Sequence, residues 1–315
     1  SETLGRPIPL ATLFDAPSVA ALALLSPQDL SGADKPRIIP LRRGTGDAAL
    51  FCVVGVAIYQ SLADALPDEV SVYGCFLPAE TKLVAPENLD RGRLVFPTVE
   101  EIAAEYVAAI RAIRPTGPYH VAGVSFGGVI AYAVAAQLRA AGHEVPTVAL
   151  LDALLPSDFL RHPRRWTSER IMPFVRQRAQ REAFRKLALG RLGRPPRAFE
   201  EPELAALRDF AYDHAVARFT KRMPTFDGDI LVVGALDRSE YGHREIDPTS
   251  GFREVVRGSI RRIDVEGSHI GILAEPGVRD EQDGVGRDRG GEGHAVAVGG
   301  DGRADAAGQL GEADR

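Results

Sequence analysis

A serine stands between glycines at the point where a strand-like run meets a helix-like run. The segment "YHVAGVSFGGVIAYAVAAQL" covers residues 119–138 and contains Gly123, Ser125 and Gly127 in a G-x-S-x-G arrangement. The apolar residues before Ser125 are typical of a buried strand, and those after it are typical of a buried helix. A serine on such a sharp turn is exposed to a substrate, and the helix N-terminus favours negative charge that develops beside it. The pattern therefore predicts that Ser125 is a nucleophile.

A serine nucleophile requires a base, and His269 is the histidine in the most suitable position. The segment "VEGSHIGIL" places His269 in a Gly-Ser turn directly after a strand-like run. A loop at this point can bring an imidazole over the edge where the strands of a parallel sheet end. The other histidines lie at a strand start, at a helix end, in a polar loop, within residues 156–224 or in the C-terminal segment. We therefore assign the base to His269.

Two aspartates are candidates for the acid that orients the imidazole. Asp152 ends the strand-like run "TVALLD", and Asp237 follows the strand-like run "DILVVGA". Both lie after the C-terminal end of a predicted strand and after the serine in the chain, as the order Ser, acid, His requires. The spacing alone leaves both aspartates open.

The negative charge of an acyl-transfer intermediate requires two backbone N–H donors. Phe126 is expected to supply one, because it directly follows the nucleophile. The second is expected from the loop "CVVGVAIYQ". We favour Val54 there and retain Val53 and Val56 as alternatives, with Gly55 allowing close backbone approach.

The rest of the chain supplies alternating elements that would position these residues. Strand-like runs cover 49–54, 70–75, 119–124, 147–152, 229–235 and 259–265, and helix-like segments include 98–113 and 127–141. Residues 156–224 show no strand pattern and indicate several helices, which are a possible lid over the sheet. The sequence therefore predicts an α/β-hydrolase fold, with a mostly parallel sheet, helices on both faces and a helical lid insertion.

Composition limits the classes of partner. The chain has 315 residues, of which 45% are hydrophobic, and a net charge of −5, so it can build a large core and shows no sign of binding nucleic acid. No segment reads as a signal peptide or a membrane span, so a cytoplasmic location without a membrane partner is expected. Cys52 and Cys75 lie in apolar strand-like runs, so a disulfide framework is not expected. No metal site is expected either.

Several segments resemble the thioesterase domains that end nonribosomal peptide synthetases and polyketide synthases. They are "LFCVVGVAIYQSLADALP", "RPTGPYHVAGVSFGG", "LLDALLP" and "GSHIGIL", and the resemblance covers about residues 36–276. The early segment "GRPIPLATLFDAPSVAALA" resembles the last helices of a carrier domain, so residues 1–35 are predicted to be a carrier remnant with its linker. Residues 277–315 are rich in glycine and charge, and they are predicted to be a disordered tail.

The resemblance implies a specific activity. In this family the acid commonly follows the strand after the nucleophile helix, which favours Asp152 over Asp237. Ser125 would take an acyl or peptidyl chain from the phosphopantetheine of a carrier domain upstream in the same synthase. Hydrolysis or macrocyclisation would then release the chain. No cofactor would bind directly, because the substrate arrives on phosphopantetheine.

The chain departs from the family pattern at two places. The loop after the first core strand, "VVGVAI", is shorter than the family's usual loop, and "AEPGVRDEQDG" does not continue as the usual final helix. Two other functions are kept as alternatives. One is a free-standing carboxylesterase or lipase, and the other is a catalytically silent interaction module with a hydrolase fold.

The possible lid has two features that allow alternative interpretations. Residues 161–197 contain many arginines and lysines but only Glu169 and Glu182 as acids. They would dock an acidic carrier surface or the pantetheine phosphate, or simply form solvated helix faces. Trp166, Phe174 and Phe184 would line an acyl channel, or pack the lid onto the body.

Overall fold

The computed structural model describes residues 20, 37–76, 97–155, 178–192, 199–237, 247–269 and 271–273. The predicted carrier remnant, apart from Ala20, lies outside these ranges, and so does the predicted tail at 277–315. The first part of the possible lid, 156–177, lies outside them as well. The domain boundaries drawn from the sequence therefore remain predictions.

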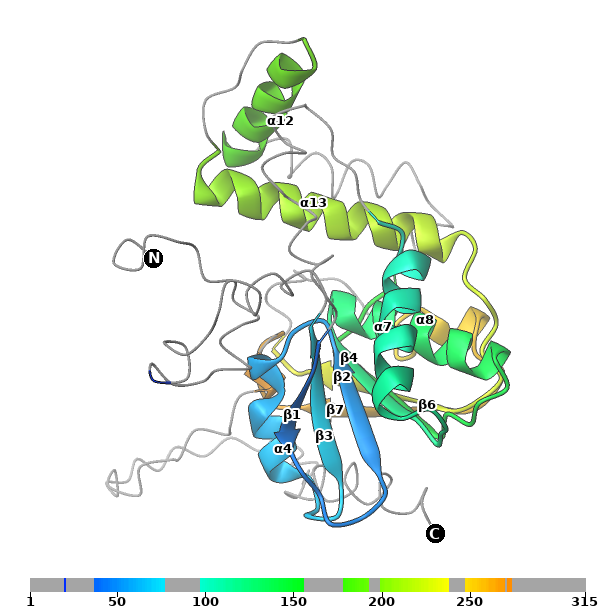
Figure 1. Cartoon of the computed structure of the whole chain (residues 1–315). Helices are drawn as coiled ribbons and strands as arrows, with labels where there is room; N and C mark the ends of the chain where they lie inside the picture. The colour runs from blue at the N-terminus through cyan, green and yellow to red at the C-terminus, as the bar shows by residue number, and fades with distance from the viewer. Residues whose placement is uncertain are drawn as a thin grey trace, which may run out of the picture.

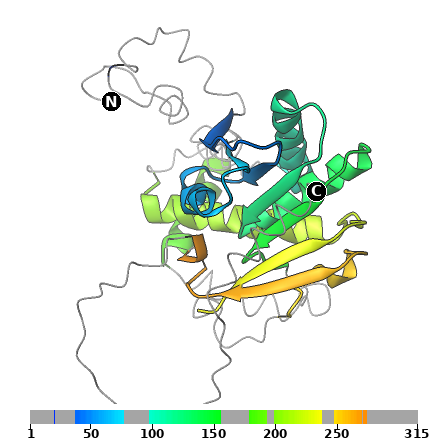
Figure 2. The same cartoon turned by 90° about the horizontal axis from the view of Figure 1, so that it is seen from below.

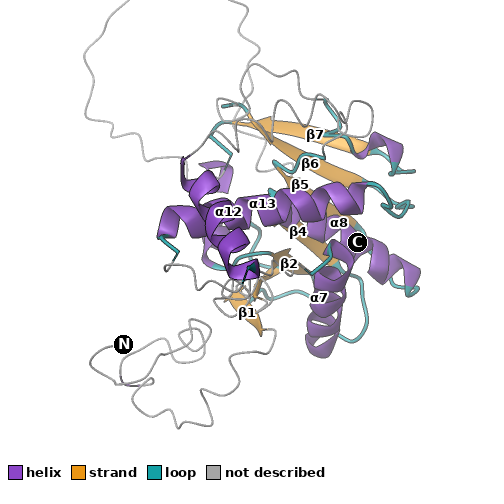
Figure 3. Cartoon of the chain, turned by 90° about the horizontal axis from the view of Figure 1, so that it is seen from above, coloured by secondary structure: helices purple, strands orange, loops and turns teal. Residues whose placement is uncertain are grey.

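The body is built on a seven-stranded sheet with the order β1-β3-β2-β4-β5-β6-β7. All neighbouring strands run parallel except β1, which is antiparallel to β3. Figure 3 shows the strands side by side, from β1 at one edge to β7 at the other, and Figure 1 shows the same sheet from another side. The bounds are β1 Arg37–Arg42, β2 Ala49–Val53, β3 Ser71–Phe76, β4 His120–Val124, β5 Thr147–Leu151, β6 Ile230–Ala235 and β7 Ile260–Val265. Strands β2 to β7 confirm the six strands that were predicted from the sequence.

Strand β1 was not predicted from the sequence. Its segment "RIIPLR" contains Pro40, and the register shifts between Pro40 and Arg42. Proline lacks the N–H that a central ladder needs, so within sheets it is confined to edges and bulges. β1 lies at such an edge, where long-range pairing with β3 outweighs a weak local signal.

Helices cover both faces of the sheet. They are α4 Gln60–Ala65, α7 Val99–Ile113, α8 Phe126–Ala140, α12 Arg178–Arg191 and α13 Glu201–Thr220, with short 3-10 turns η3 Ala57–Tyr59, η6 Phe252–Glu254 and η7 Gly271–Leu273. Successive β2 side chains point to opposite faces. Phe51 joins the core with α7 and α8, whereas Cys52 joins the core that includes Ala63 of α4. Figure 2 shows the sheet with helices on both of its sides. The predicted helices at 98–113 and 127–141 and the predicted layering are confirmed.

The two helices described in the possible lid are α12 and α13. Phe219 of α13 is buried in the main core, so α13 is fixed to the body. In Figure 1, α13 lies across the ends of α7 and α8, and α12 stands beyond it. Phe184 of α12 contacts Phe210 of α13 edge-to-face at 5.1 Å, so it packs the two lid helices together. Trp166 and Phe174 lie outside the described residues.

A buried ion pair also joins the two lid helices. Nζ of Lys186 lies 2.7 Å from a carboxylate oxygen of Glu203, and both side chains are almost completely buried. The same oxygen accepts the backbone N–H of Glu200, which precedes α13. A buried charge is tolerated when it is paired and hydrogen-bonded, and both conditions hold here. α12 is therefore held to α13 by apolar and ionic contacts.

Candidate active site

Ser125 occupies the predicted turn between β4 and α8. It is the N-cap of α8 with φ 55° and ψ −124°, a positive-φ conformation that non-glycine residues rarely adopt. Its backbone N–H donates to the carbonyl of Leu151 on β5 at 2.9 Å, and its own carbonyl accepts the N–H of Gly128 at 3.0 Å. Strain of this kind persists only where the surroundings fix the backbone.

Close backbone packing explains the glycines beside Ser125. A Cβ atom at Gly123 would lie 2.1 Å from the carbonyl oxygen of Gly127, and one at Gly128 would lie 2.3 Å from Cβ of Ala153. A Cβ atom at Gly127 would lie 2.9 Å from the carbonyl oxygen of Val53. The strand, the helix and the β2 loop therefore meet around the serine at distances that only glycine permits.

Gly123→Ala is expected to destabilise the protein by about 3 kcal/mol or more, because the new methyl group overlaps backbone that cannot rotate away. Gly142→Ala is the matched control. Gly142 has φ 83°, and a Cβ atom added there would have no neighbour within 4 Å, so the substitution should cost only about 1 kcal/mol of backbone strain. Urea unfolding followed by circular dichroism measures both. Equal losses would show that the packing around Ser125 is looser than the structure indicates.

The structure pairs His269 with Asp152. Nδ1 of His269 lies 2.7 Å from Oδ2 of Asp152, and the other carboxylate oxygen accepts the N–H of Ala235 at 3.1 Å. The Asp152 side chain is 5% exposed and that of His269 is 17% exposed, so the carboxylate is buried and the imidazole keeps some contact with solvent. Asp152 directly follows β5 with φ 44°, which turns its side chain toward the histidine loop. The sequence alone left the two aspartates open, and the geometry brings Asp152 to the imidazole.

Asp237 has a different place in the structure. Its backbone N–H donates to the carbonyl of Gly267 at 3.1 Å, two residues before His269. Asp237 thus contacts the histidine loop through its main chain. The carboxylate that lies 2.7 Å from the imidazole is that of Asp152.

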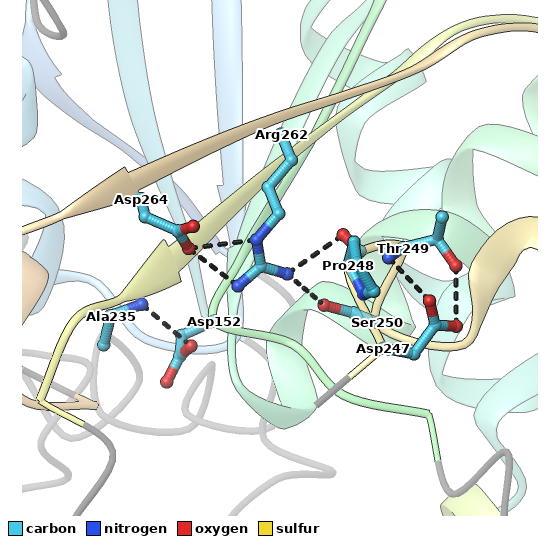
Figure 4. A network of polar contacts seen from close by, with 8 residues as sticks. All are labelled: Asp152, Ala235, Asp247, Pro248, Thr249, Ser250, Arg262 and Asp264. Carbon is cyan, nitrogen blue, oxygen red and sulfur yellow. Dashed lines mark hydrogen bonds and ion pairs between the residues drawn. The ribbon is translucent and has the colours of Figure 1, made fainter. Parts of the chain in front are cut away.

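A network of polar contacts joins β7 to residues 247–250, which in turn contact the chain that follows Asp152 (Figure 4). Arg262 of β7 donates to Oδ1 of Asp264 at 2.9 and 2.7 Å and to the carbonyl of Pro248 at 3.0 Å. The carbonyl of Ser250 in turn accepts the N–H of Leu155, three residues after Asp152. This network was not predicted from the sequence. The signal was present in "RRID", where Arg262 and Asp264 are two residues apart and share one face of a strand.

Phe126 and Val54 are the two residues expected to donate to an oxyanion, and the structure shows the contacts of each. Phe126 begins α8, and its ring stacks on Tyr212 of α13 with a centroid separation of 4.4 Å. Val54 has φ 60°, and its N–H donates to the hydroxyl of Tyr106 at 2.9 Å. Val53 is the last residue of β2. In the structure, the N–H of Val54 therefore donates to a tyrosine hydroxyl.

Other expectations concern metals, thiols and membranes. Across the described ranges, no group of three or more His, Cys, Asp or Glu residues is arranged to hold a metal ion. Within the same ranges, none of the helices is long and apolar enough to cross a bilayer. Cys52 and Cys75 are buried and are not joined in a disulfide, and burial raises the pKa of Cys52 well above its usual range.

Comparison with known proteins decides the family. Residues 51–280 match the family model described as a thioesterase domain. The chain belongs to this thioesterase domain family. It is 32% identical over 310 residues to a probable non-canonical nonribosomal peptide synthetase, CymA, of Salinispora arenicola, a match covering 87% of this chain and 4% of that protein. It is 31% identical over 163 residues to a dimodular nonribosomal peptide synthase of Bacillus subtilis, covering 50% of this chain and 6% of the synthase. The thioesterase domain is thus related to those of nonribosomal peptide synthetases, of which it spans a small fraction.

Solved structures agree on the fold. The crystal structure of the NocB thioesterase domain from the nocardicin cluster has a TM-score of 0.50 at 24% identity, covering 76% of this chain and 92% of that one. The holo form of AB3403, a four-domain nonribosomal peptide synthetase, has a TM-score of 0.51 at 21% identity, covering 75% of this chain and 19% of that one. The predicted hydrolase fold is confirmed. The predicted carrier remnant precedes the residues that the family model matches.

Proposed function

We propose that this thioesterase domain releases an acyl or peptidyl chain from a carrier domain through an ester on Ser125. One observation carries the proposal: a serine strained at the start of α8 lies at the same sheet edge as the hydrogen-bonded Asp152–His269 pair, whose carboxylate is buried. The strands β4 to β7 are parallel neighbours, so their C-terminal ends gather these residues at one edge. In open α/β sheets this edge is where ligands bind.

The first half-reaction transfers the chain to the enzyme. Oγ of Ser125 attacks the thioester carbonyl carbon while Nε2 of His269 takes the hydroxyl proton. Asp152, hydrogen-bonded to Nδ1, fixes the tautomer and stabilises the imidazolium. The tetrahedral intermediate then collapses, its C–S bond breaks, and His269 returns the proton to the pantetheine sulfur. The products are the acyl-Ser125 ester and the free carrier thiol.

The second half-reaction frees the product. His269 removes a proton from water, or from a hydroxyl or amine of the bound chain, and the resulting nucleophile attacks the ester carbonyl. Collapse breaks the bond to Oγ of Ser125, which regains its proton from His269. Water gives a linear acid, and an internal nucleophile gives a macrocycle. Exclusion of water by the lid would decide between them.

The oxyanion of both intermediates requires two N–H donors. The N–H of Phe126 at the start of α8 is proposed as the first, because the helix dipole adds to its effect. Val54 is proposed as the second donor. Its N–H, which donates to the Tyr106 hydroxyl in this structure, would donate to the substrate oxygen instead when the substrate binds. Val56 in the same loop is the alternative.

The relatives support a carrier-bound substrate. The synthetases that the chain resembles are multidomain proteins, and AB3403 holds its matching region within four domains. We propose that the substrate arrives on phosphopantetheine from a carrier domain of the same synthase. No directly bound cofactor enters this mechanism.

The experiment is intact mass spectrometry after treatment with a fluorophosphonate, followed by peptide mapping. One adduct on Ser125 is the expected result. Absence of any adduct on folded protein would favour the silent interaction module. Turnover of a pantetheine thioester is then compared with that of an oxygen ester of the same acid. Preference for the thioester supports the release function, and preference for the oxygen ester would support a carboxylesterase.

A further inference from the structure

The hydroxyl of Tyr59 joins the ends of the two central strands. Tyr59 lies in η3 and its side chain is completely buried. The hydroxyl donates to the carbonyl of Val53 at the end of β2, at 2.7 Å, and accepts the N–H of Val124 at the end of β4, at 3.0 Å. Val124 is the residue directly before Ser125. One buried hydroxyl therefore contacts both the oxyanion loop, residues 53–56, and the nucleophile turn.

The strand pairing explains why a side chain takes this place. Pairing between β2 and β4 stops at Val53 and Gly123. Successive N–H groups of a strand point to opposite neighbours, and that of Ser125 donates to β5, so that of Val124 faces β2. Val54 turns away at φ 60°, and the Tyr59 hydroxyl receives the N–H of Val124. Without it, a buried backbone donor next to the nucleophile would lack this partner.

The same hydroxyl lies beneath the first turn of α8. A Cβ atom at Gly127 would lie 3.5 Å from the Tyr59 oxygen and 3.1 Å from Cβ of Val54. The two non-glycine residues with positive φ at this junction, Val54 and Ser125, each directly follow a residue that Tyr59 holds. Strained residues keep their conformation only when their surroundings fix it. Tyr59 is placed to fix both.

We propose that Tyr59 is a positioning residue that sets the oxyanion loop relative to Ser125. Tyr59 does not touch the substrate. It acts through the carbonyl of Val53 and the N–H of Val124, and so controls the distance between the serine Oγ and the loop's N–H donor. The inference rests on the proposed function of Ser125.

The test is Tyr59→Phe, which keeps the ring and removes the hydroxyl. We expect kcat for thioester release, per active site titrated with fluorophosphonate, to fall about 10- to 100-fold, because misplacement of a catalytic group by about 1 Å can cost up to about 100-fold. KM should stay within about twofold. The midpoint of the pH–rate profile should not move, because the His269–Asp152 pair is intact, and only the plateau should fall.

Tyr132→Phe is the matched control. Tyr132 is a buried tyrosine of α8 whose hydroxyl donates to the carbonyl of Pro224 at 2.7 Å, away from the turn. It should lose stability but keep its kcat per titrated site. The proposal is overturned if Tyr59→Phe retains the wild-type kcat per titrated site, as Tyr132→Phe should. A lower fraction of titratable sites with an unchanged kcat per site counts as this outcome. Failure of the wild type to react would instead overturn the proposed function.

A second variant serves if Tyr59→Phe does not fold. Replacing Tyr59 by para-aminophenylalanine retains a donor for the carbonyl of Val53 and weakens the acceptor for the N–H of Val124. Its kcat per titrated site should be several-fold below that of the wild type. A wild-type kcat in this variant would contradict the proposal.

Discussion

Ser125→Ala is expected to lower kcat for thioester release by about 10⁶-fold, because no other group at the sheet edge is proposed to form the acyl ester. The fluorophosphonate adduct should vanish in the same variant. Ser259→Ala, at a serine that precedes β7, is the control and should retain both turnover and labelling. Residual labelling at another residue of Ser125→Ala would contradict the assignment of the nucleophile.

Comparison with Ser125→Gly separates catalysis from strain. Both variants should be inactive. Glycine adopts φ 55° without a Cβ clash, so Ser125→Gly should be more stable than Ser125→Ala by about 1 kcal/mol in denaturant unfolding. Equal stability would mean that the turn is not strained, and the backbone would then contribute less to presenting the serine.

Asp152→Asn is expected to lower kcat by about 10⁴-fold. An amide cannot hold the imidazole in the tautomer that accepts the serine proton, and it does not stabilise the imidazolium. The 2.7 Å contact between Oδ2 and Nδ1 of His269 would then become an amide contact of similar shape, so the fold should be retained. Steady-state turnover of a pantetheine thioester, together with a thermal melt, measures the two effects separately.

Asp237→Asn is the control for this substitution. Asp237 contacts the histidine loop through its backbone N–H, which the substitution keeps. Its kcat should therefore remain within a few-fold of the wild type. A larger loss of kcat in Asp237→Asn than in Asp152→Asn would instead assign the role of the acid to Asp237, which follows β6.

Most of the architecture could be predicted from the sequence alone, because it depends on residues that are close together in the chain. The apolar runs that became β2 and β4 are fully buried, and α8 is buried nearly all round, so local pattern and final environment agree. The same holds for Ser125, because a strand, a glycine-flanked turn and a helix are set by consecutive residues of one short segment. The position of His269 could be predicted as well, because it follows the last strand of the chain within a few residues.

Tertiary contacts decided the features that depend on residues far apart in the chain. Asp152 and Asp237 both follow strands, and only the crossing of loops over the sheet edge shows that His269 pairs with Asp152 across 117 positions. Likewise, the N–H of Val54 is engaged by Tyr106, 52 residues away. Strand β1 forms because β3 offers it an edge, despite Pro40. Local periodicity reports which face of an element is buried, whereas a hydrogen bond between distant loops depends on three-dimensional distances that no local pattern encodes.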